Sequence, residues 1–402
     1  MSVAGCGDSY SDAKGYVDPA ALNTGLPQVI INTEHNQSIT SKEYYIKAAV
    51  QISDPDNAAH NLTADDYNAE IRGRGNSTWV YPKKPYRLKF TSKQGLFGLE
   101  QAKSWVLLAN FRDPTMLMNI IAFELGARFG FAYTNHYIPV DLVLNGVYEG
   151  TYVLTEQVQV GAGRVDIDED QGFLVELDFH YDEEPKFKTS IIHLPVMIKS
   201  PEDLGPSGYD FVKDAINALE AALYAESFPE SGYRDLIDLD NFVDYILIND
   251  LLMNTELQCP ASVYMYRDAG AGAKIKLGPL WDFDSGFGFQ EATARTFFTK
   301  YTGRIPFIVQ FDGIEGQFFF RKFFEDPVFR ARYKARWIEK YADIDSMIHF
   351  IDGMAEELYA SQQQNYQVWQ WSGGTDYNGE IAKMKLWWRN RVAYLDAEIR
   401  KY

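Results

Sequence analysis

The sequence has few cysteines and no long apolar run, and each deficit argues against a class of protein. Its 402 residues include only two cysteines, Cys6 and Cys259, which are too few for a disulfide framework. No stretch of about 18 consecutive apolar residues occurs, so we expect no transmembrane helix. The six histidines are scattered without the spacing of metal ligands, which argues against a zinc site.

Positive charge is also scarce. The chain has 38 Lys and Arg against 56 Asp and Glu, a formal net charge of −18. A nucleic-acid partner is therefore not expected, because the phosphate backbone attracts basic proteins. The locally basic stretch runs from Arg72 to Lys93, and we expect any anion to bind there. Signatures of the Gly-x-Ser-x-Gly, Walker and Gly-x-Gly-x-x-Gly types are missing.

Residues 1–26 begin with a run rich in Gly, Ser and Asp, which predicts a flexible tether. Within it, Val3-Ala4-Gly5-Cys6 has the small-residue pattern of a bacterial lipoprotein cleavage site. This pattern predicts a lipid anchor at Cys6 and an extracytoplasmic, membrane-anchored bacterial lipoprotein. The alternative is that Cys6 is an incidental residue of a frayed terminus, and both interpretations stay open.

The most informative stretch is Arg72-Gly73-Arg74-Gly75-Asn76-Ser77-Thr78-Trp79. Its glycines allow unusual backbone angles and close approach, so the turn can surround an anion. The following Tyr86–Phe90 alternates apolar and basic residues, which predicts a half-buried strand with Arg87 and Lys89 on one face. Kinase-like folds hold nucleotide phosphates with such a loop and a lysine on a strand. The simpler alternative is a solvated basic face.

Apolar patterning divides the chain into a strand-rich and a helical part. Period-two and short apolar runs predict strands over 28–31, 44–52, 67–72, 86–90, 105–109, 137–144, 147–158, 172–178, 261–267 and 274–280. Helical spacing predicts helices over 115–130, 210–224, 239–253, 323–345, 347–371 and 381–401. We therefore expect an α+β protein with a sheet-rich N-terminal lobe, residues 27–180, and a mainly helical C-terminal lobe, residues 181–402.

Carboxylates follow two of these elements. Asp282 and Asp284 come after a strand and before a glycine-rich turn, an arrangement that suits Mg²⁺ or forms an ordinary turn. Asn254 and Glu256 follow a hydrophobic helix. There Asn254 would hold a metal and Glu256 would accept a proton; the alternative is that both residues simply cap the helix. Asp250 is a second candidate base.

Glu156 lies at the end of a strand that should be buried. A carboxylate there would pair with a lysine or meet a nucleotide. Glu124, in the helix predicted over 115–130, is the competing lysine partner, although most helical glutamates are solvated.

Taken in order, these motifs resemble the CotH family, the spore-coat-protein-H-like atypical protein kinases. The resemblance covers roughly residues 65–400. It rests on the Arg-Gly loop, Pro82-Lys-Lys-Pro-Tyr-Arg-Leu-Lys89, Trp105-x-Leu-Leu-Ala-Asn110 with Asp113, Asn145-Gly-x-Tyr-x-Gly-x-Tyr-x-Leu-x-Glu156, Gly172-Phe-Leu-Val-Glu-Leu-Asp178 and Trp281-Asp-Phe-Asp284.

The resemblance implies a divergent two-lobe protein-kinase-like fold that uses ATP and Mg²⁺ or Mn²⁺ to phosphorylate Ser or Thr of a protein substrate. By motif it assigns nucleotide contacts to Arg72, Arg74, Asn76, Lys84, Lys89 and Glu156. It assigns metal ligation to Asp282, Asp284 and Asn254, and catalysis to Glu256, Asp282 and Lys89.

Two positions depart from the family pattern. The family has Asn-x-Asp where this chain has Asn254-Thr255-Glu256, and often Arg-Asn where it has Met118-Asn119. The extra methylene of Glu256 shifts its carboxylate by about 1.5 Å, and a misplacement of about 1 Å can cost on the order of 10²-fold in rate.

These departures keep other functions open. One alternative is a catalytically impaired CotH-like surface lipoprotein that binds a protein or a glycan. Its glycan would stack on tryptophans of the C-terminal part, namely Trp369, Trp371, Trp387 and Trp388. A third interpretation is a hydrolase that uses Asp282 and Glu256 as a carboxylate pair.

Overall fold

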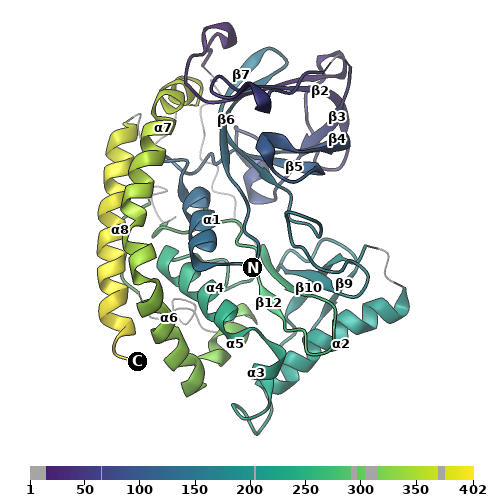
Figure 1. Ribbon diagram of the computed structural model, residues 1–402, viewed down its shortest axis with the longest axis vertical. Coiled ribbons are helices and arrows are strands. Elements are labelled where there is room, and N and C mark those ends of the chain that lie inside the picture. The colour runs from purple at the N-terminus through teal and green to yellow at the C-terminus, as the bar shows by residue number, and fades with distance from the viewer. Residues whose placement is uncertain (1–14, 65, 203–204, 291–296, 304–314, 370–375) are drawn as a thin grey trace. The chain divides into compact units, whose positions relative to one another are not determined.

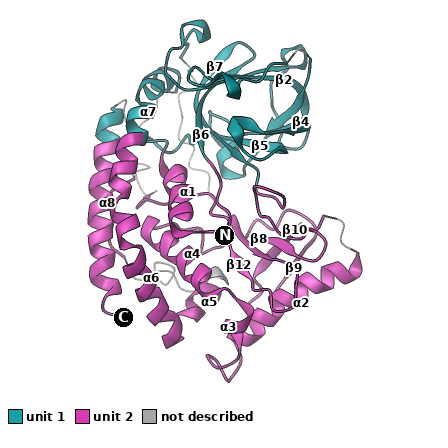
Figure 2. Ribbon diagram, viewed as in Figure 1, with its two compact units in different colours: residues 1–116, 137–157, 354–380 teal, residues 117–136, 158–353, 381–402 magenta. Residues whose placement is uncertain are grey.

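We analysed a computed structural model, which describes residues 15–64, 66–202, 205–290, 297–303, 315–369 and 376–402 (Figure 1). Cys6 and Trp371 lie outside these ranges. The chain divides into two compact units (Figure 2). We call residues 1–116, 137–157 and 354–380 the barrel unit, and residues 117–136, 158–353 and 381–402 the second unit.

Seven strands of the barrel unit form a closed barrel in the order β1-β2-β3-β4-β5-β7-β6. All neighbours are antiparallel except β1 and β6, whose parallel pairing closes the ring. Closure leaves no unpaired strand edge in this ring. The strands are β1 (Gln28–Thr33), β2 (Ile46–Ser53), β3 (Ala69–Gly73), β4 (Tyr86–Gln94), β5 (Ala102–Leu108), β6 (Ile138–Leu144) and β7 (Val147–Glu156).

The barrel core follows from strand alternation. In β4, Tyr86, Leu88 and Phe90 are buried, whereas Arg87 is half-buried and Lys89 is exposed, which confirms the predicted faces. The interior is filled by aliphatic and aromatic side chains such as Val29, Ile31, Ile71, Leu88 and Trp105. Their burial supplies the main stabilising term of this unit.

The β6–β7 hairpin confirms a turn predicted from the sequence. Asn145 and Gly146 join the two strands with φ of 50° and 75°, the left-handed angles that a two-residue hairpin turn requires. The Asn145 side chain also accepts a hydrogen bond from the Thr33 backbone N–H at 2.8 Å, which ties the turn to β1.

The second unit contains a five-stranded sheet and several helices. The sheet order is β12-β11-β8-β10-β9, and every pair is antiparallel. Its strands are β8 (Phe173–Leu177), β9 (Lys186–Lys188), β10 (Pro195–Ser200), β11 (Val263–Arg267) and β12 (Lys276–Leu277). The helices that lie wholly in this unit are α1 (Met118–Phe129), α2 (Pro206–Leu223), α3 (Tyr233–Leu236), α4 (Leu239–Leu252), α5 (Glu315–Phe323) and α6 (Pro327–Asp345).

Helices α7 (Met347–Val368) and α8 (Tyr377–Ile399) contribute residues to both units. The helix predicted over 323–345 is interrupted, because Asp326 caps α6 and Pro327 occupies its first position. No helix in the described part of the chain combines the length and apolarity needed to cross a membrane.

The general class, α+β with strands first and helices later, is confirmed. The closed barrel was not predicted from the sequence. The pairing of β1 with β6 that closes it joins two segments far apart in the chain, and no local sequence pattern indicates that pairing. The units also differ from the predicted boundary at residue 180. β8 pairs with β10 and β11 of the second unit, and residues 354–380 belong with the barrel.

The predicted flexible tether is only partly described. Two residues of its described part contact distant parts of the barrel unit: the Gly15 N–H donates to the Val368 carbonyl at 3.0 Å. The Thr24 hydroxyl donates to the buried Asp141 carboxylate. Gly15 and Thr24 are therefore anchored in the barrel unit, whereas residues 1–14 of the predicted tether lie outside the described residues.

Candidate functional site

Helix α4 ends at the candidate catalytic residues. It begins after Asp238, whose carboxylate accepts from the Asn241 N–H at 3.2 Å, and it ends at Met253 with φ of 51°. Asn254 is buried, and its side-chain N–H donates to Asn249 Oδ1 at 3.0 Å. Asn254 Oδ1 in turn accepts from the Glu256 N–H at 3.4 Å. The helix end thus determines where Asn254 and the Glu256 backbone lie.

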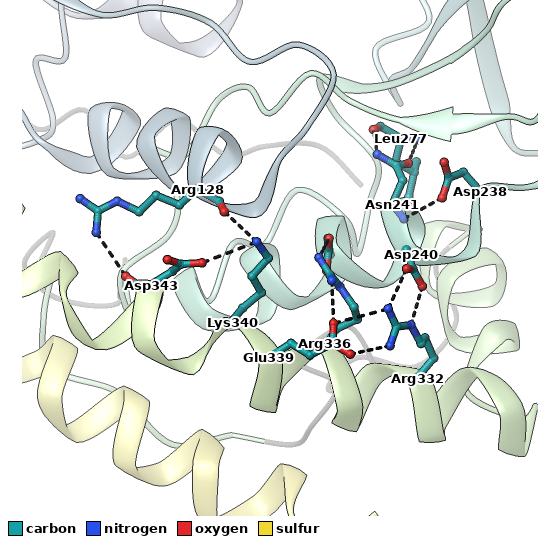
Figure 3. A network of polar contacts seen from close by, with 11 residues as sticks. Arg128, Asp238, Asp240, Asn241, Leu277, Arg332, Arg336, Glu339, Lys340 and Asp343 are labelled. Atoms are coloured by element: carbon teal, nitrogen blue, oxygen red, sulfur yellow. Dashed lines mark hydrogen bonds and ion pairs between the residues drawn. The ribbon is translucent and has the colours of Figure 1, made fainter.

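Two ion pairs hold α4 against α6 (Figure 3). Arg336 binds the Asp244 carboxylate with two hydrogen bonds of 2.8 and 2.6 Å. One turn away on both helices, Arg332 binds Asp240 in the same two-pronged way. Glu339 contacts both arginines, at 2.7 Å each. A two-pronged arginine–carboxylate pair fixes the relative orientation of its two side chains as well as stabilising the contact. Helix α6 therefore aligns α4, the helix that ends at the candidate site.

The segment that follows β12 packs against the end of α4. The Phe283 N–H donates to Asn119 Oδ1 at 2.9 Å, and the Phe287 N–H donates to the Leu252 carbonyl at 2.6 Å. Gly286 is required at this approach, because an added Cβ would lie 2.9 Å from the Leu252 carbonyl oxygen. Asp282 has φ of 61°, a strained angle for a non-glycine residue that is often found at functional sites.

These contacts bring three predicted carboxylates together. Burial, and then the nearby carboxylates of Asp282 and Asp284, raise the pKa of Glu256 well above its usual range, whereas a hydrogen bond with Ser285 opposes the shift. Asp178, at the end of β8, adds a further negative charge. We call Glu256, Asp282 and Asp284, whose charges act on one another, the acidic cluster; Asn254 lies beside it through its contact with the Glu256 N–H.

The alternative base Asp250 lies elsewhere. It is buried and accepts a hydrogen bond from the Tyr333 hydroxyl of α6 at 2.6 Å. Glu124, the alternative lysine partner, accepts from Arg128 Nε at 2.7 Å instead. Each of these two carboxylates is therefore held by a neighbouring side chain.

Two backbone N–H groups of the Arg-Gly loop in the barrel unit already donate to carbonyls of the protein. The Gly73 N–H donates to the Ser41 carbonyl at 2.8 Å, and the Arg74 N–H donates to the Pro85 carbonyl at 3.2 Å. Asn76 is exposed and accepts from Lys42 Nζ at 3.1 Å. These two amides are therefore engaged within the protein, and the arginine side chains are the stronger candidates for binding an anion.

The three lysines of the following segment have different environments. Lys89 is exposed on β4, with Nζ 6.0 Å from the centre of the Tyr45 ring. Lys84 Nζ donates to the Trp79 carbonyl at 2.7 Å. Lys83, which the sequence analysis did not select, is buried.

Lys83 belongs to a polar network inside the barrel unit. Its Nζ donates to the Thr151 carbonyl and, at 3.0 Å, to Asn365 Oδ1 of α7. Burial lowers the pKa of Lys83 to about 7, although the charges of Glu149 and Asp141 oppose the shift. In the sequence, Lys83 lies in Pro82-Lys83-Lys84-Pro85, a polar segment that does not indicate burial.

Glu156 ends β7 and is buried, as predicted. It lies opposite Trp105 of β5 and accepts from the Thr155 hydroxyl at 3.3 Å. The strand positions the carboxylate at the end of the barrel wall.

One face of α8 supports the end of α4, a role that the sequence analysis did not assign to it. Trp387, Arg391 and Tyr394 donate to the carbonyls of residues 300, 301 and 303 at 2.7, 2.9 and 2.6 Å. The buried Arg391 also donates to the Asp250 and Leu251 carbonyls at the end of α4. In the sequence, their spacing of four and three residues indicates only that the three side chains share one face of a helix.

The tryptophans proposed for sugar stacking are mostly unavailable. Trp387 and Trp388 are each 1% exposed, so neither offers a face to a ligand. Trp369 is half-buried and donates through Nε1 to the Glu149 carbonyl at 2.7 Å.

The described structure is thus an α+β chain in which buried polar and acidic residues gather near the end of α4. The family model described as CotH kinase protein matches residues 71–395, and the chain therefore belongs to the CotH kinase family. The comparison with curated proteins found no match.

Proposed function

We propose that this protein is an ATP- and divalent-metal-dependent atypical kinase that phosphorylates Ser or Thr of a surface or extracytoplasmic protein. The observation that carries the proposal is the convergence of Glu256, Asp282 and Asp284 at the end of α4, in a chain of the CotH kinase family. The proposal includes a divergent two-lobe kinase-like fold. Family membership favours phosphoryl transfer over a carboxylate-pair hydrolase.

The acidic cluster fits a hard cation. Asp282 and Asp284 offer carboxylate oxygens and Asn254 offers an amide oxygen, which are the donor types that Mg²⁺ and Mn²⁺ prefer. In the described residues no group of three or more His, Cys, Asp or Glu is arranged to bind a metal by itself. Mg²⁺ sites often use only one or two carboxylates and take further oxygens from substrate phosphates and water. When bound, the metal would neutralise charge on the transferred phosphoryl group.

The residues would then divide the work. The substrate hydroxyl oxygen forms a bond to the γ-phosphorus of ATP, the bond from that phosphorus to the bridging oxygen breaks, and ADP leaves. Glu256 would accept the hydroxyl proton. Asn254 and Asp282 would hold the metal with Asp284, and Asn119 keeps this turn in place through Phe283.

Nucleotide contacts keep the assignments that family resemblance suggests. They comprise Arg72, Arg74, Asn76, Lys84, Lys89 and Glu156. Within this set, the engaged amides of the Arg-Gly loop favour side-chain contacts over a backbone cradle. A lipid anchor at Cys6 is part of the same proposal, and membrane fractionation of Cys6→Ser in the native host would test it.

Calorimetric titration of ATP, with Mg²⁺ or Mn²⁺, tests the nucleotide site. We expect metal-dependent binding to the wild type and its loss in Asp282→Ala. Asp210→Ala, at an exposed position of α2, removes a carboxylate of the same size and should bind ATP like the wild type. Absence of ATP binding under every metal condition would refute the proposal.

A second candidate is a catalytically impaired relative that binds a protein at the cell surface. Glu256 favours it, because its carboxylate is one methylene longer than the aspartate of the family pattern. Transfer of labelled γ-phosphate to a protein mixture by the wild type and by Glu256→Asp separates the two. Labelling by the wild type supports the kinase, whereas labelling by Glu256→Asp alone supports the impaired relative.

A further inference from the structure

Two arginines lie side by side on the outer face of the barrel. Arg72 of β3 and Arg87 of β4 are directly opposite each other in the antiparallel register. Their neighbours Ile71 and Leu88 are fully buried in the core, so both arginines occupy the face that alternates with it. Like charges in directly opposed positions repel each other, because their Cβ atoms are about 5 Å apart.

The next row of the same strands is arranged differently. Glu70 of β3 lies between Lys47 of β2 and Lys89 of β4, so each lysine has an acidic cross-strand neighbour. Lys47 also pairs with Glu34 at 3.8 Å. The arginine row lacks such compensation: Arg87 is followed across the sheet by Val106 and then Thr155.

One nitrogen donor of each arginine side chain also lacks a hydrogen-bond acceptor among the described residues. The Nε atoms of Arg72 and Arg87 are out of contact with solvent and have no acceptor among the described residues. A buried donor without an acceptor is costly, and two in one cross-strand pair are unusual. The Arg72 guanidinium lies 5.0 Å from the centre of the Tyr45 ring, a contact that restrains its orientation without accepting its hydrogen bonds in the plane.

We propose that Arg72 and Arg87 together bind a phosphate-rich anion on the outer face of β3 and β4. Two guanidinium groups supply two positive charges and several donors in planar forks, which match a multiply charged phosphate better than a single carboxylate. That the anion is the polyphosphate of a nucleotide rests on the proposed function. Arg87 then joins Arg72 as a phosphate-binding residue.

Inorganic tripolyphosphate is the appropriate probe, because it carries the charge of the nucleotide without its base. Calorimetric titration without metal should show binding to the wild type and at least about tenfold weaker binding to Arg87→Gln, since a hydrogen bond to a charged group is lost. Lys93→Gln, at an exposed position farther along β4, should bind like the wild type. Equal affinity of all three proteins, or no binding to the wild type, would overturn the proposal.

Further variants separate a binding defect from a folding defect. Arg87→Lys keeps the charge but loses the fork, so its affinity should fall between those of the wild type and Arg87→Gln. Thermal melting of Arg87→Gln should match or exceed that of the wild type, because like-charge repulsion is removed. Weak binding with a strongly lowered melting temperature would count against a binding role.

The two proposals fail separately. Asp282→Ala should bind tripolyphosphate normally in the absence of metal, because Asp282 belongs to the acidic cluster. If tripolyphosphate binding depends on Arg87 but ATP never binds, the anion site stands and the kinase proposal fails. If ATP binding requires Asp282 and is unchanged in Arg87→Gln, the kinase proposal stands and this inference is wrong.

Discussion

Lys83 should make the stability of the protein depend on pH. In the folded state burial lowers its pKa from 10.5 to about 7, so the unfolded chain binds the proton more strongly. Between these two values the unfolded state carries more protons, and the free energy of unfolding must therefore rise with pH. Below about pH 7 both states are protonated, and the full penalty for burying the ammonium group is present.

The magnitude follows from the two pKa values. The fall in pKa from 10.5 to about 7 corresponds to a full penalty of about 5 kcal/mol, at 1.36 kcal/mol for each pKa unit. Between about pH 6 and pH 9.5, linkage predicts that roughly 3 kcal/mol of it is recovered. Other groups titrate in this range, so the informative quantity is the difference between the wild type and a variant that cannot be charged.

Urea unfolding of the wild type and Lys83→Met across this pH range measures that difference. The variant loses the hydrogen bonds to Thr151 and Asn365, which is a nearly pH-independent cost. Its stability relative to the wild type should therefore fall by about 3 kcal/mol as the pH rises from about 6 to 9.5. Lys93→Met, at an exposed lysine of the same segment, should show a flat difference. A flat difference for Lys83→Met as well would refute the reasoning.

Three further predictions concern the support of the acidic cluster. Arg336→Met leaves the buried Asp244 without its partner and should lower the free energy of unfolding by about 3–5 kcal/mol, with recovery when Asp244→Asn is added; urea unfolding checks both. Gly286→Ala places a Cβ 2.9 Å from the Leu252 carbonyl and should lower stability by about 1–3 kcal/mol; an unchanged melting temperature would contradict this. Arg391→Met removes the donors to the end of α4 and should lower kcat at least about tenfold with little change in ATP affinity; equal losses in both would indicate general unfolding instead.

Several parts of the fold could be predicted because the decisive interactions are local. The Asn145-Gly146 turn follows from the backbone angles of a two-residue hairpin, and the faces of β4 follow from alternation. Helix α4 begins where Asp238 can cap it. The family could also be predicted, because its motifs recur in order along the chain.

The acidic cluster was predicted only in part. The residue types of Asp282 and Glu256 indicated metal and proton chemistry, but their proximity depends on Phe287 and Leu252, which join segments far apart in the chain. In the sequence, nothing distinguished Arg87 from the neighbouring lysines as a candidate for binding an anion. Its lack of an acidic neighbour became visible only through the register of β3 and β4.

Local sequence patterns were enough to identify the family, the α+β class, and the local turns and caps. The tertiary structure alone decided the closure of the barrel through β1 and β6, the burial of Lys83, and the grouping of residues 354–380 with the barrel. The physical reason is range: turns, caps and strand faces depend on a few neighbouring residues. Strand partners, burial and charge compensation depend on which distant segments pack together.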